Sequence, residues 1–321
     1  MQVSEIPADQ LDPRHFIVEQ AEAIAARVGD GIAINALSGG VDSAAVTMLG
    51  HRAIGDRLKT YIVDNALMRE GEPEHIAAIF ADLGVPVSVI DARDEFITAL
   101  AGIVDPEQKR EAVTQTFYKR VFGRLVRDSG AKFLLQGTIL TDIDETVAGI
   151  KRQHNVFEQL GIDPAEAFGY EIIEPLVQLR KDGVRKVAQA AGLPEEIYNR
   201  MPFPGPARAA RIIGEVTPAK LDIVRRCTLI VERELAGCGA FQYMAILHED
   251  RVTGIRDGER DFGMQIELRC FDSVDARTAT PTRLPWDTLE RVASLITKDV
   301  AGVVSVTYNI TPKPPSTMEA V

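Results

Sequence analysis

The sequence has few cysteines, one tryptophan and no long apolar run. Cys227, Cys238 and Cys270 form no Cys-x-x-Cys pair, and the histidines show no His-Glu-x-x-His spacing. We therefore expect isolated thiols in a reducing cytoplasm, not a disulfide framework or a cysteine metal site. No stretch reaches the ~18 apolar residues of a membrane span. The first ten residues lack the basic and apolar parts of a signal peptide. We expect a cytoplasmic protein that does not bind membranes.

Positive charge is also in deficit. The chain carries 36 Lys and Arg against 47 Asp and Glu, a net charge of −11. A nucleic-acid surface needs clustered cations, so we expect no nucleic-acid partner. The composition is otherwise that of a globular protein, with 45% hydrophobic and 26% charged residues. A length of 321 residues favours two domains.

The common phosphate-loop motifs G-x-x-x-x-G-K-[ST] and G-x-G-x-x-G are absent as well. The chain offers a different loop, Ser38–Ser43, between an apolar run at 31–36 and a helix-like run at 44–51. A strand, a Gly-rich turn and a helix start form an anion site, because backbone N–H groups converge there and the helix dipole favours negative charge. The sequence therefore predicts a phosphate site at this turn.

Individual residues of this turn support that interpretation. Gly39 and Gly40 allow the backbone to approach phosphate closely. Ser38 and Ser43 can donate hydroxyl hydrogen bonds. Asp42 would repel bare phosphate, which indicates a Mg²⁺ ion between them. The alternative is an ordinary helix start with Ser38 or Asp42 as its cap.

Short apolar runs alternate with helical patterns in the first two thirds of the chain. We expect strands at 31–36, 58–64, 85–91 and 132–137, and helices at 11–28, 75–83, 106–127 and 181–191. This alternation predicts an α/β fold with a parallel sheet covered by helices on both faces. Ligands of such sheets bind at the carboxyl ends of the strands, where Ser38, Asp64 and Gly137 fall.

A proline-rich segment at 202–206 marks a change of pattern. Beyond it we expect strands at 212–216, 242–248, 264–271 and 303–310, and helices at 218–235 and 286–299. The order β-α-β-β-α-β predicts a small α+β domain. We therefore expect domains at 1–203 and 204–321, with a lid at about 138–169.

The loop at 38–43 resembles the S-G-G-x-D-S loop of the N-type ATP pyrophosphatases, which cleave ATP between the α and β phosphates. Further motifs resemble, in order, those of the ATP-pyrophosphatase subunit of GMP synthase. They are V-D-N-G-L-L-R at 64–69, D-P-E-E-K-R at 105–110, Q-G-T-I at 136–139, P-D-x-I-E-S at Asp142 and Glu145, K-x-H-H-N at 151–155, E-P-L at 174–176, P-F-P-G-P at 202–206 with the following Arg211, and K-P-P-A-T-I-E at 313–319. By these motifs the chain is identified as a member of that family, of the archaeal two-subunit type.

The resemblance implies an adenine-nucleotide α-hydrolase-like fold and a ligase that uses ATP and Mg²⁺. The C2 oxygen of XMP attacks the α-phosphate of ATP, pyrophosphate leaves, and ammonia then displaces AMP to give GMP. The ATP site would comprise Ser38, Gly39, Gly40, Val41, Asp42, Ser43, Val63 and Gly137, with Asp42 near the metal. The catalytic residues would be Asp42 and, on the lid, Asp142, Glu145, Lys151 and His154. The XMP site would comprise Arg110, Arg211, Lys313, Thr317 and Glu319.

The resemblance also implies two protein partners. The chain contains no G-x-C-x-G nucleophile elbow of a glutaminase, so ammonia would come from a separate glutamine amidotransferase subunit or from solution. We also expect a homodimer through the C-terminal domain, because a sheet with one helical layer leaves a face to cover.

Departures from the family pattern lie near the nucleotide substrate. Met201 replaces a histidine, Ala207–Ala210 replaces a G-L-[GA]-V segment, and Gln153 replaces the first histidine of the lid motif. Arg208 adds a cation beside Arg211. These changes keep two alternatives open: a paralogue that adenylates and aminates a different carbonyl or nucleotide, and a non-catalytic member that binds nucleotide and regulates a partner.

Overall fold

The computed structural model describes residues 4–147, 170–200, 205–274 and 276–320, with only the backbone at 145–147. The chain forms two compact units, and each contains separated segments. Unit 1 comprises the described residues of Met1–Asp64, Gly71–Ala92 and Thr116–Arg200. Unit 2 comprises the described residues of Asn65–Glu70, Arg93–Gln115 and Met201–Val321. Unit 2 thus includes two segments of the domain predicted at 1–203. The predicted boundary itself lies outside the described residues.

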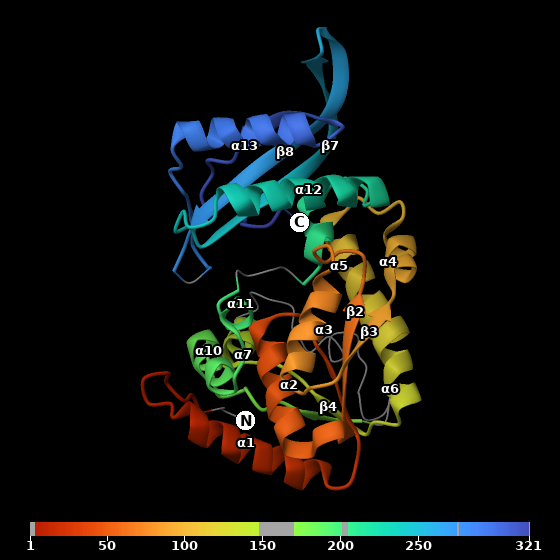
Figure 1. Cartoon of the computed structure of the whole chain (residues 1–321), viewed down its shortest axis with the longest axis vertical. Coiled ribbons are helices and arrows are strands. Elements are labelled where there is room, and N and C mark those ends of the chain that lie inside the picture. Colours follow the sequence, from red (N-terminus) through yellow and green to blue (C-terminus); the bar gives the residue numbers. More distant parts are fainter. Residues whose placement is uncertain (1–3, 148–169, 201–204, 275, 321) are drawn as a thin grey trace. The chain divides into compact units, whose positions relative to one another are not determined.

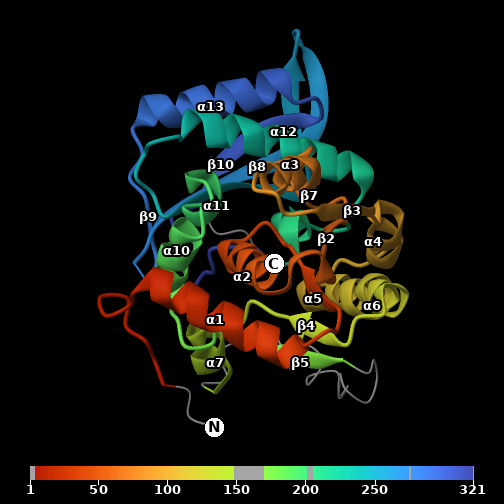
Figure 2. The same ribbon diagram turned by 60° about the horizontal axis from the view of Figure 1, so that its bottom comes forward.

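Unit 1 is built on a parallel sheet of five strands in the order β3-β2-β1-β4-β5. The strands are β1 (Ala33–Ala36), β2 (Leu58–Asp64), β3 (Val87–Asp91), β4 (Phe133–Leu135) and β5 (Glu171–Ile173). The helical elements of this unit are α1 (Pro13–Val28), α2 (Val41–Ile54), η1 (Gly55–Arg57), α3 (Glu72–Asp82), η2 (Thr116–Phe122), α6 (Gly123–Ser129), α7 (Leu140–Val147), α10 (Lys181–Ala190) and α11 (Glu195–Tyr198). Figures 1 and 2 show helices on both faces of the sheet, which confirms the predicted α/β class.

Strand β1 is the middle strand of the sheet, and the burial of its residues fits this position. Ala33 and Ile34 are fully buried although they point to opposite faces, so both faces of the strand are covered. Helix α1 begins where the Asp12 carboxylate accepts hydrogen bonds from the backbone N–H groups of Arg14 and His15. It buries an apolar stripe that includes Phe16.

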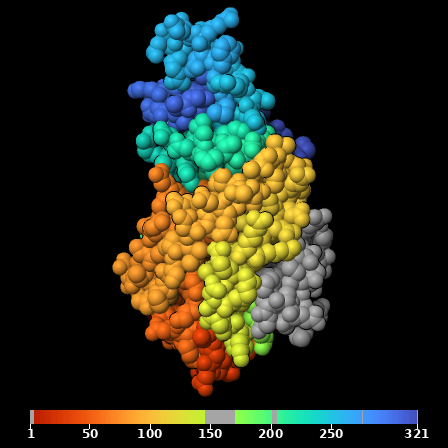
Figure 3. Space-filling model, turned by 90° about the vertical axis from the view of Figure 1, so that its right-hand side faces the viewer, coloured from red at the N-terminus to blue at the C-terminus, as the bar shows by residue number. Residues whose placement is uncertain are grey.

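The stretch expected to be one helix at 106–127 is interrupted. The chain forms α5 (Pro106–Gln115), then the π-helical turns of η2, then α6. A π-helical insertion rotates the following residues around the axis. Val121, Leu125 and Val126 face inward, whereas Arg124 and Arg127 are exposed. In the space-filling view of Figure 3 this yellow segment lies at the surface.

Unit 2 contains a second sheet in the order β10-β8-β7-β6, with β9 paired to β8. Its strands are β6 (Ile212–Ile213), β7 (Gln242–Arg256), β8 (Glu259–Asp272), β9 (Thr280–Pro281) and β10 (Val303–Tyr308). Its helical elements are α4 (Arg93–Leu100), α5, η3 (Ala207–Arg211), α12 (Pro218–Glu234) and α13 (Trp286–Asp299). The order of β6, α12, β7, β8, α13 and β10 confirms the predicted small α+β fold.

Strands β7 and β8 are longer than expected. They form an antiparallel hairpin that pairs Arg256 with Glu259 at its turn. The hydrophobic pattern covered only the buried half of each strand, because the outer half is largely exposed and mixes polar residues with apolar ones such as Ile255 and Phe262. No helix among the described residues has the length and apolar character needed to cross a bilayer.

Candidate active site

The loop after β1 has the geometry of a phosphate-binding turn. Gly39 has a φ of +77°, and Gly40 precedes the first residue of α2 without a side-chain cap. The Ser38 and Ser43 hydroxyl oxygens lie 3.0 Å apart, and Ser43 Oγ also accepts a hydrogen bond from the Ser38 N–H at 3.1 Å. The first N–H groups of a helix have no partner within the helix. The loop therefore directs hydroxyl and N–H donors to one place.

Gly137 lies against this helix start. It follows β4, and a Cβ atom placed on it would lie 3.2 Å from Ser43 N and 3.1 Å from Asp42 C. The strand order reverses between β1 and β4, which is the point where open α/β sheets bind ligands at the carboxyl ends of their strands. The structure thus brings Gly137 to the Ser38–Ser43 loop.

Asp42 lies in the first turn of α2, and its two carboxylate oxygens differ in environment. Oδ2 accepts a hydrogen bond from Lys181 Nζ at 2.6 Å. Oδ1 is buried and has no hydrogen-bond partner among the described residues. A buried carboxylate oxygen without a donor fits a cation ligand, and Mg²⁺ commonly takes one or two carboxylates together with substrate phosphates. Lys181, at the start of α10, was not predicted because no local pattern links it to Asp42.

The predicted lid residues are described only in part. Asp142 lies in α7, where its Oδ2 accepts a hydrogen bond from the Ile139 N–H at 3.1 Å. Only the backbone of Glu145 is described, in the same helix, and Lys151 and His154 lie outside the described residues. Val63 is buried in β2.

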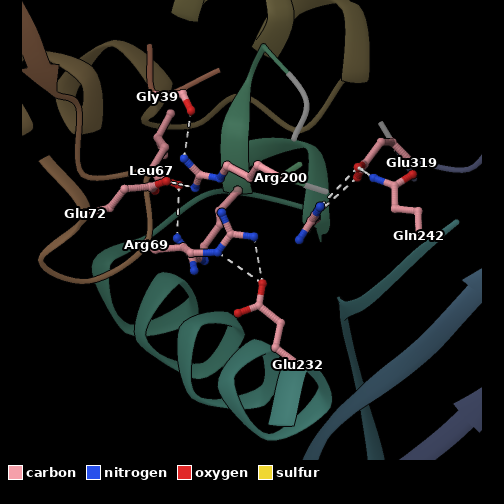
Figure 4. Close-up of polar contacts among 10 residues, drawn as sticks. Gly39, Leu67, Arg69, Glu72, Arg200, Glu232, Gln242 and Glu319 are labelled. Atoms are coloured by element: carbon pink, nitrogen blue, oxygen red, sulfur yellow. Dashed lines mark hydrogen bonds and ion pairs between the residues drawn. The ribbon is translucent and has the colours of Figure 1, made fainter. Parts of the chain in front are cut away.

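Unit 2 contains a buried ion pair between two residues predicted to bind XMP (Figure 4). Arg211 Nε and Nη2 lie 3.3 and 3.2 Å from the two carboxylate oxygens of Glu319. The Arg211 side chain is 2% exposed. Gln242 Nε2 donates to Glu319 Oε1 at 2.9 Å, so three segments meet at one carboxylate. No pattern in the sequence indicates Gln242.

Arg208 is also buried, and its backbone N–H donates to the carbonyl oxygen of Leu67 at 3.1 Å. Burial, followed by the nearby charges of Arg69, Arg211 and Arg225, lowers the pKa of Arg208 to about 9. Arg69 is paired with Glu232, whose Oε1 accepts hydrogen bonds from it at 3.0 and 2.7 Å. Unit 2 therefore concentrates positive charge next to the Arg211–Glu319 pair.

The C-terminal segment is held by backbone contacts. Arg269 Nη1 donates to the carbonyl oxygens of Thr317 and Met318 at 3.0 and 3.2 Å. Glu267 Oε1 accepts a hydrogen bond from Arg269 Nε at 2.6 Å. Burial opposes ionisation of Glu267, but hydrogen bonds from His248, Arg269 and Asn309 outweigh it and hold its pKa at about 2. Arg269 was not predicted, although it fixes the segment that carries Thr317.

The two remaining residues predicted to bind XMP occupy other parts of unit 2. Lys313 Nζ donates to the carbonyl oxygen of Ala276 at 2.8 Å, and the Lys313 backbone pairs with Ala279. Arg110, on α5, lies 3.9 Å from Glu107 and is half-exposed. Its neighbour Lys109 is fully buried and donates to the carbonyl oxygen of Ile212 at 2.7 Å. Lys109 therefore links the helix that carries Arg110 to the residue after Arg211.

A parallel sheet with a Gly-rich loop at its point of reversal is typical of nucleotide-binding α/β proteins. Residues 233–320 match the family described as GMP synthase C terminal domain. The chain is 47% identical over 309 residues to a subunit of glutamine-hydrolyzing GMP synthase from Archaeoglobus fulgidus, covering 96% of this chain and 99% of that protein. It is 46% identical over 307 residues to the subunit of the same name from Pyrococcus furiosus, covering 95% and 96%. The chain belongs to the family of this GMP synthase subunit.

Proposed function

We propose that this chain catalyses the ATP-dependent amination of XMP to GMP and releases AMP and pyrophosphate. Membership in the GMP synthase subunit family over 96% of the chain is the observation that carries this proposal. It makes the chain a ligase of the GMP synthase type, as the sequence predicted. It also favours XMP over the alternative of a different carbonyl or nucleotide substrate.

The ATP half of the reaction is assigned to the loop between β1 and α2. Ser38, Ser43 and the N–H groups of the α2 start would hold the β and γ phosphates, because all are donors directed to one place. Gly137 has no Cβ atom, so the end of β4 can lie in close contact with that helix start. These donors stabilise the negative charge that moves onto pyrophosphate as it leaves.

The buried Oδ1 of Asp42 is the atom assigned to hold Mg²⁺. No cluster of three metal-ligating side chains occurs in the described part of the chain. When bound, Mg²⁺ neutralises phosphate charge in the transition state. Lys181 holds the other Asp42 oxygen and thereby orients the carboxylate.

The XMP half is assigned to unit 2. Arg211 would bind the phosphate of XMP in place of its partner Glu319, since a guanidinium binds phosphate with two parallel hydrogen bonds. Arg110 and Lys313 would add positive charge, and Thr317 and Glu319 would contact the purine or ribose. The buried positive charge around Arg208 supports an anionic ligand here.

The remaining steps are assigned by family membership. Asp142 and Glu145 of α7, with Lys151 and His154, would close over the adenylated intermediate and exclude water, which would otherwise hydrolyse it. Ammonia would come from a separate glutamine amidotransferase subunit. The relatives are named as one subunit of a glutamine-hydrolyzing enzyme, which supports a partner subunit. A homodimer through the C-terminal region is part of the same proposal.

The test is pyrophosphate release from ATP and Mg²⁺ with ammonium, in the presence of XMP, IMP, UTP, nicotinate adenine dinucleotide or no acceptor. Release that depends strictly on XMP, with GMP and AMP as products, is expected. Release with another acceptor would support the paralogue alternative, and no release with any acceptor would support the non-catalytic one. The Asp42→Ala variant is expected to lack the activity that the wild-type protein shows in this assay.

A further inference from the structure

Three segments of unit 1 meet at the Arg200 guanidinium (Figure 4). Arg200 follows α11, and its Nη1 donates to the carbonyl oxygen of Gly39 at 3.0 Å. Its Nη2 forms an ion pair with the carboxylate of Glu72, the first residue of α3. The Glu72 side chain is only 6% exposed. Arg200 thus joins a buried carboxylate to the backbone of the loop at 38–43.

The contact with Gly39 fixes the direction of one peptide group. In a trans peptide the C=O and the following N–H point in opposite directions. With the Gly39 carbonyl turned to Arg200, the Gly40 N–H points the other way, toward Ser38 Oγ at 3.4 Å. That side of the loop also holds the Ser43 hydroxyl. The N–H therefore lies inside the turn, where it donates a long hydrogen bond to Ser38 Oγ, and the carbonyl oxygen is kept out of the turn.

Local sterics do not fix this orientation. The peptide lies between two glycines, so no Cβ atom restricts its rotation. A Cβ atom on Gly39 would lie 2.8 Å from Arg200 Nη1 and 2.5 Å from Ile76 Cδ1, so a side chain at this position would displace the ends of both side chains. A rotated peptide would present a carbonyl oxygen to an incoming phosphate. Within the loop the peptide is held by the long 3.4 Å hydrogen bond to Ser38 Oγ, and the shorter hydrogen bond, at 3.0 Å from Arg200, comes from outside the loop.

Arg200 is itself held in place. Glu72 neutralises its charge, and a second contact, between His75 Nε2 and Glu196 Oε2 at 3.0 Å, joins α3 to α11. We infer that Arg200 is a positioning residue for the β and γ phosphates of ATP, which locks the Gly39–Gly40 peptide with its N–H directed into the turn. This inference rests on the proposed use of the loop for ATP, but it does not depend on XMP as the acceptor.

The experiment measures binding of two nucleotides in the absence of an acceptor. The probes are an ATP analogue with a methylene group between the α and β phosphorus atoms, and AMP, which lacks both phosphates at issue. Arg200→Ala should weaken binding of the analogue about tenfold, the worth of one charge-assisted hydrogen bond, and leave the dissociation constant of AMP unchanged. Millimolar guanidinium should restore part of the loss. Arg52→Ala, an exposed arginine at the other end of α2, is the control and should change neither.

Equal loss of AMP and analogue binding, or no loss of either, would overturn the inference. If Arg200→Ala does not fold, Arg200→Lys serves instead, because lysine keeps the charge but not the fork that reaches both Gly39 and Glu72. It should show the same selective loss of analogue binding, and an unselective loss counts against the inference. A wild-type protein that binds the analogue but makes no GMP from XMP would contradict the proposed function and leave this inference standing.

Discussion

Arg211 and Glu319 form a two-point ion pair across 108 residues of sequence, and the arginine is 2% exposed. Removing one partner of a buried pair leaves the other charge uncompensated. We expect Arg211→Met to lower the free energy of unfolding by about 3 kcal/mol. Urea unfolding measures this. Arg211→Met combined with Glu319→Gln should recover part of the loss, and wild-type stability of the single variant would contradict the energetic role of the pair.

Ala207 adopts a φ of +51°, a backbone conformation that favours glycine. The family motif has a glycine at this position. We expect Ala207→Gly to raise the free energy of unfolding by about 0.5–1 kcal/mol, because relief of the left-handed strain exceeds the added entropy of the unfolded chain.

Ala209 provides the matched control for Ala207. It lies in the same short helix η3 but outside the left-handed region. Ala209→Gly should lower the free energy of unfolding, since glycine there only adds flexibility. Both variants can be compared by thermal unfolding, and a loss of stability in Ala207→Gly would refute the assignment of strain.

Lys109 gives the stability of unit 2 a predicted pH dependence. Burial, followed by the nearby charge of Lys220, lowers the pKa of Lys109 from 10.5 to about 8. Between pH 8 and 10.5 the unfolded chain binds this proton and the folded chain does not, so the contribution of Lys109 to stability rises with pH in that window. Glu249 and Asp105 face the same amine and oppose the shift.

The comparison that tests this pH dependence is between the wild type and Lys109→Met. The difference in free energy of unfolding between them should move in favour of the wild type from pH 8 to pH 10.5. Lys59→Met, at an exposed position of β2, serves as the control. A difference that stays constant across the window would count against the lowered pKa.

Gly137 offers a test of the ATP site. A Cβ atom there would lie 3.1–3.3 Å from backbone and Cβ atoms of Asp42 and Ser43, so Gly137→Ala must displace the start of α2. We expect the KM for ATP to rise about tenfold, the result of losing ~1.4 kcal/mol of phosphate binding. The KM for XMP should change little. Steady-state kinetics with each substrate varied in turn would show whether the effect is selective.

The sequence predicted the regular parts of the fold because they have local signals. The apolar run of β1 and the Gly-rich turn before α2 are visible in the sequence, and β2 and α13 have the predicted bounds. Strand β5 was missed, because its three residues become a strand only by pairing with β4. The helix expected at 106–127 is broken by π-helical turns, and no residue pattern in this stretch predicts them.

Site residues that belong to sequence motifs could be predicted. Residues that join the site only through tertiary contacts could not. The resemblance selected Arg211 and Glu319 but not their mutual contact, which joins η3 to the end of the described chain. Lys181, Gln242 and Arg269 act on predicted residues from distant positions, so no spacing reveals them. The assignment of the site residues to ATP and XMP stays a prediction.

The segments Asn65–Glu70 and Arg93–Gln115 belong to the unit that is otherwise formed by the last third of the chain. During synthesis on the ribosome Leu67 emerges 141 residues before its partner Arg208, and Lys109 emerges 103 residues before its partner Ile212. Until those partners are made, Lys109 has no Ile212 carbonyl to bind. The early segments must therefore wait at least until Arg208 and Ile212 have been made, and a ribosome that stalls before residue 205 leaves them without the unit in which they fold.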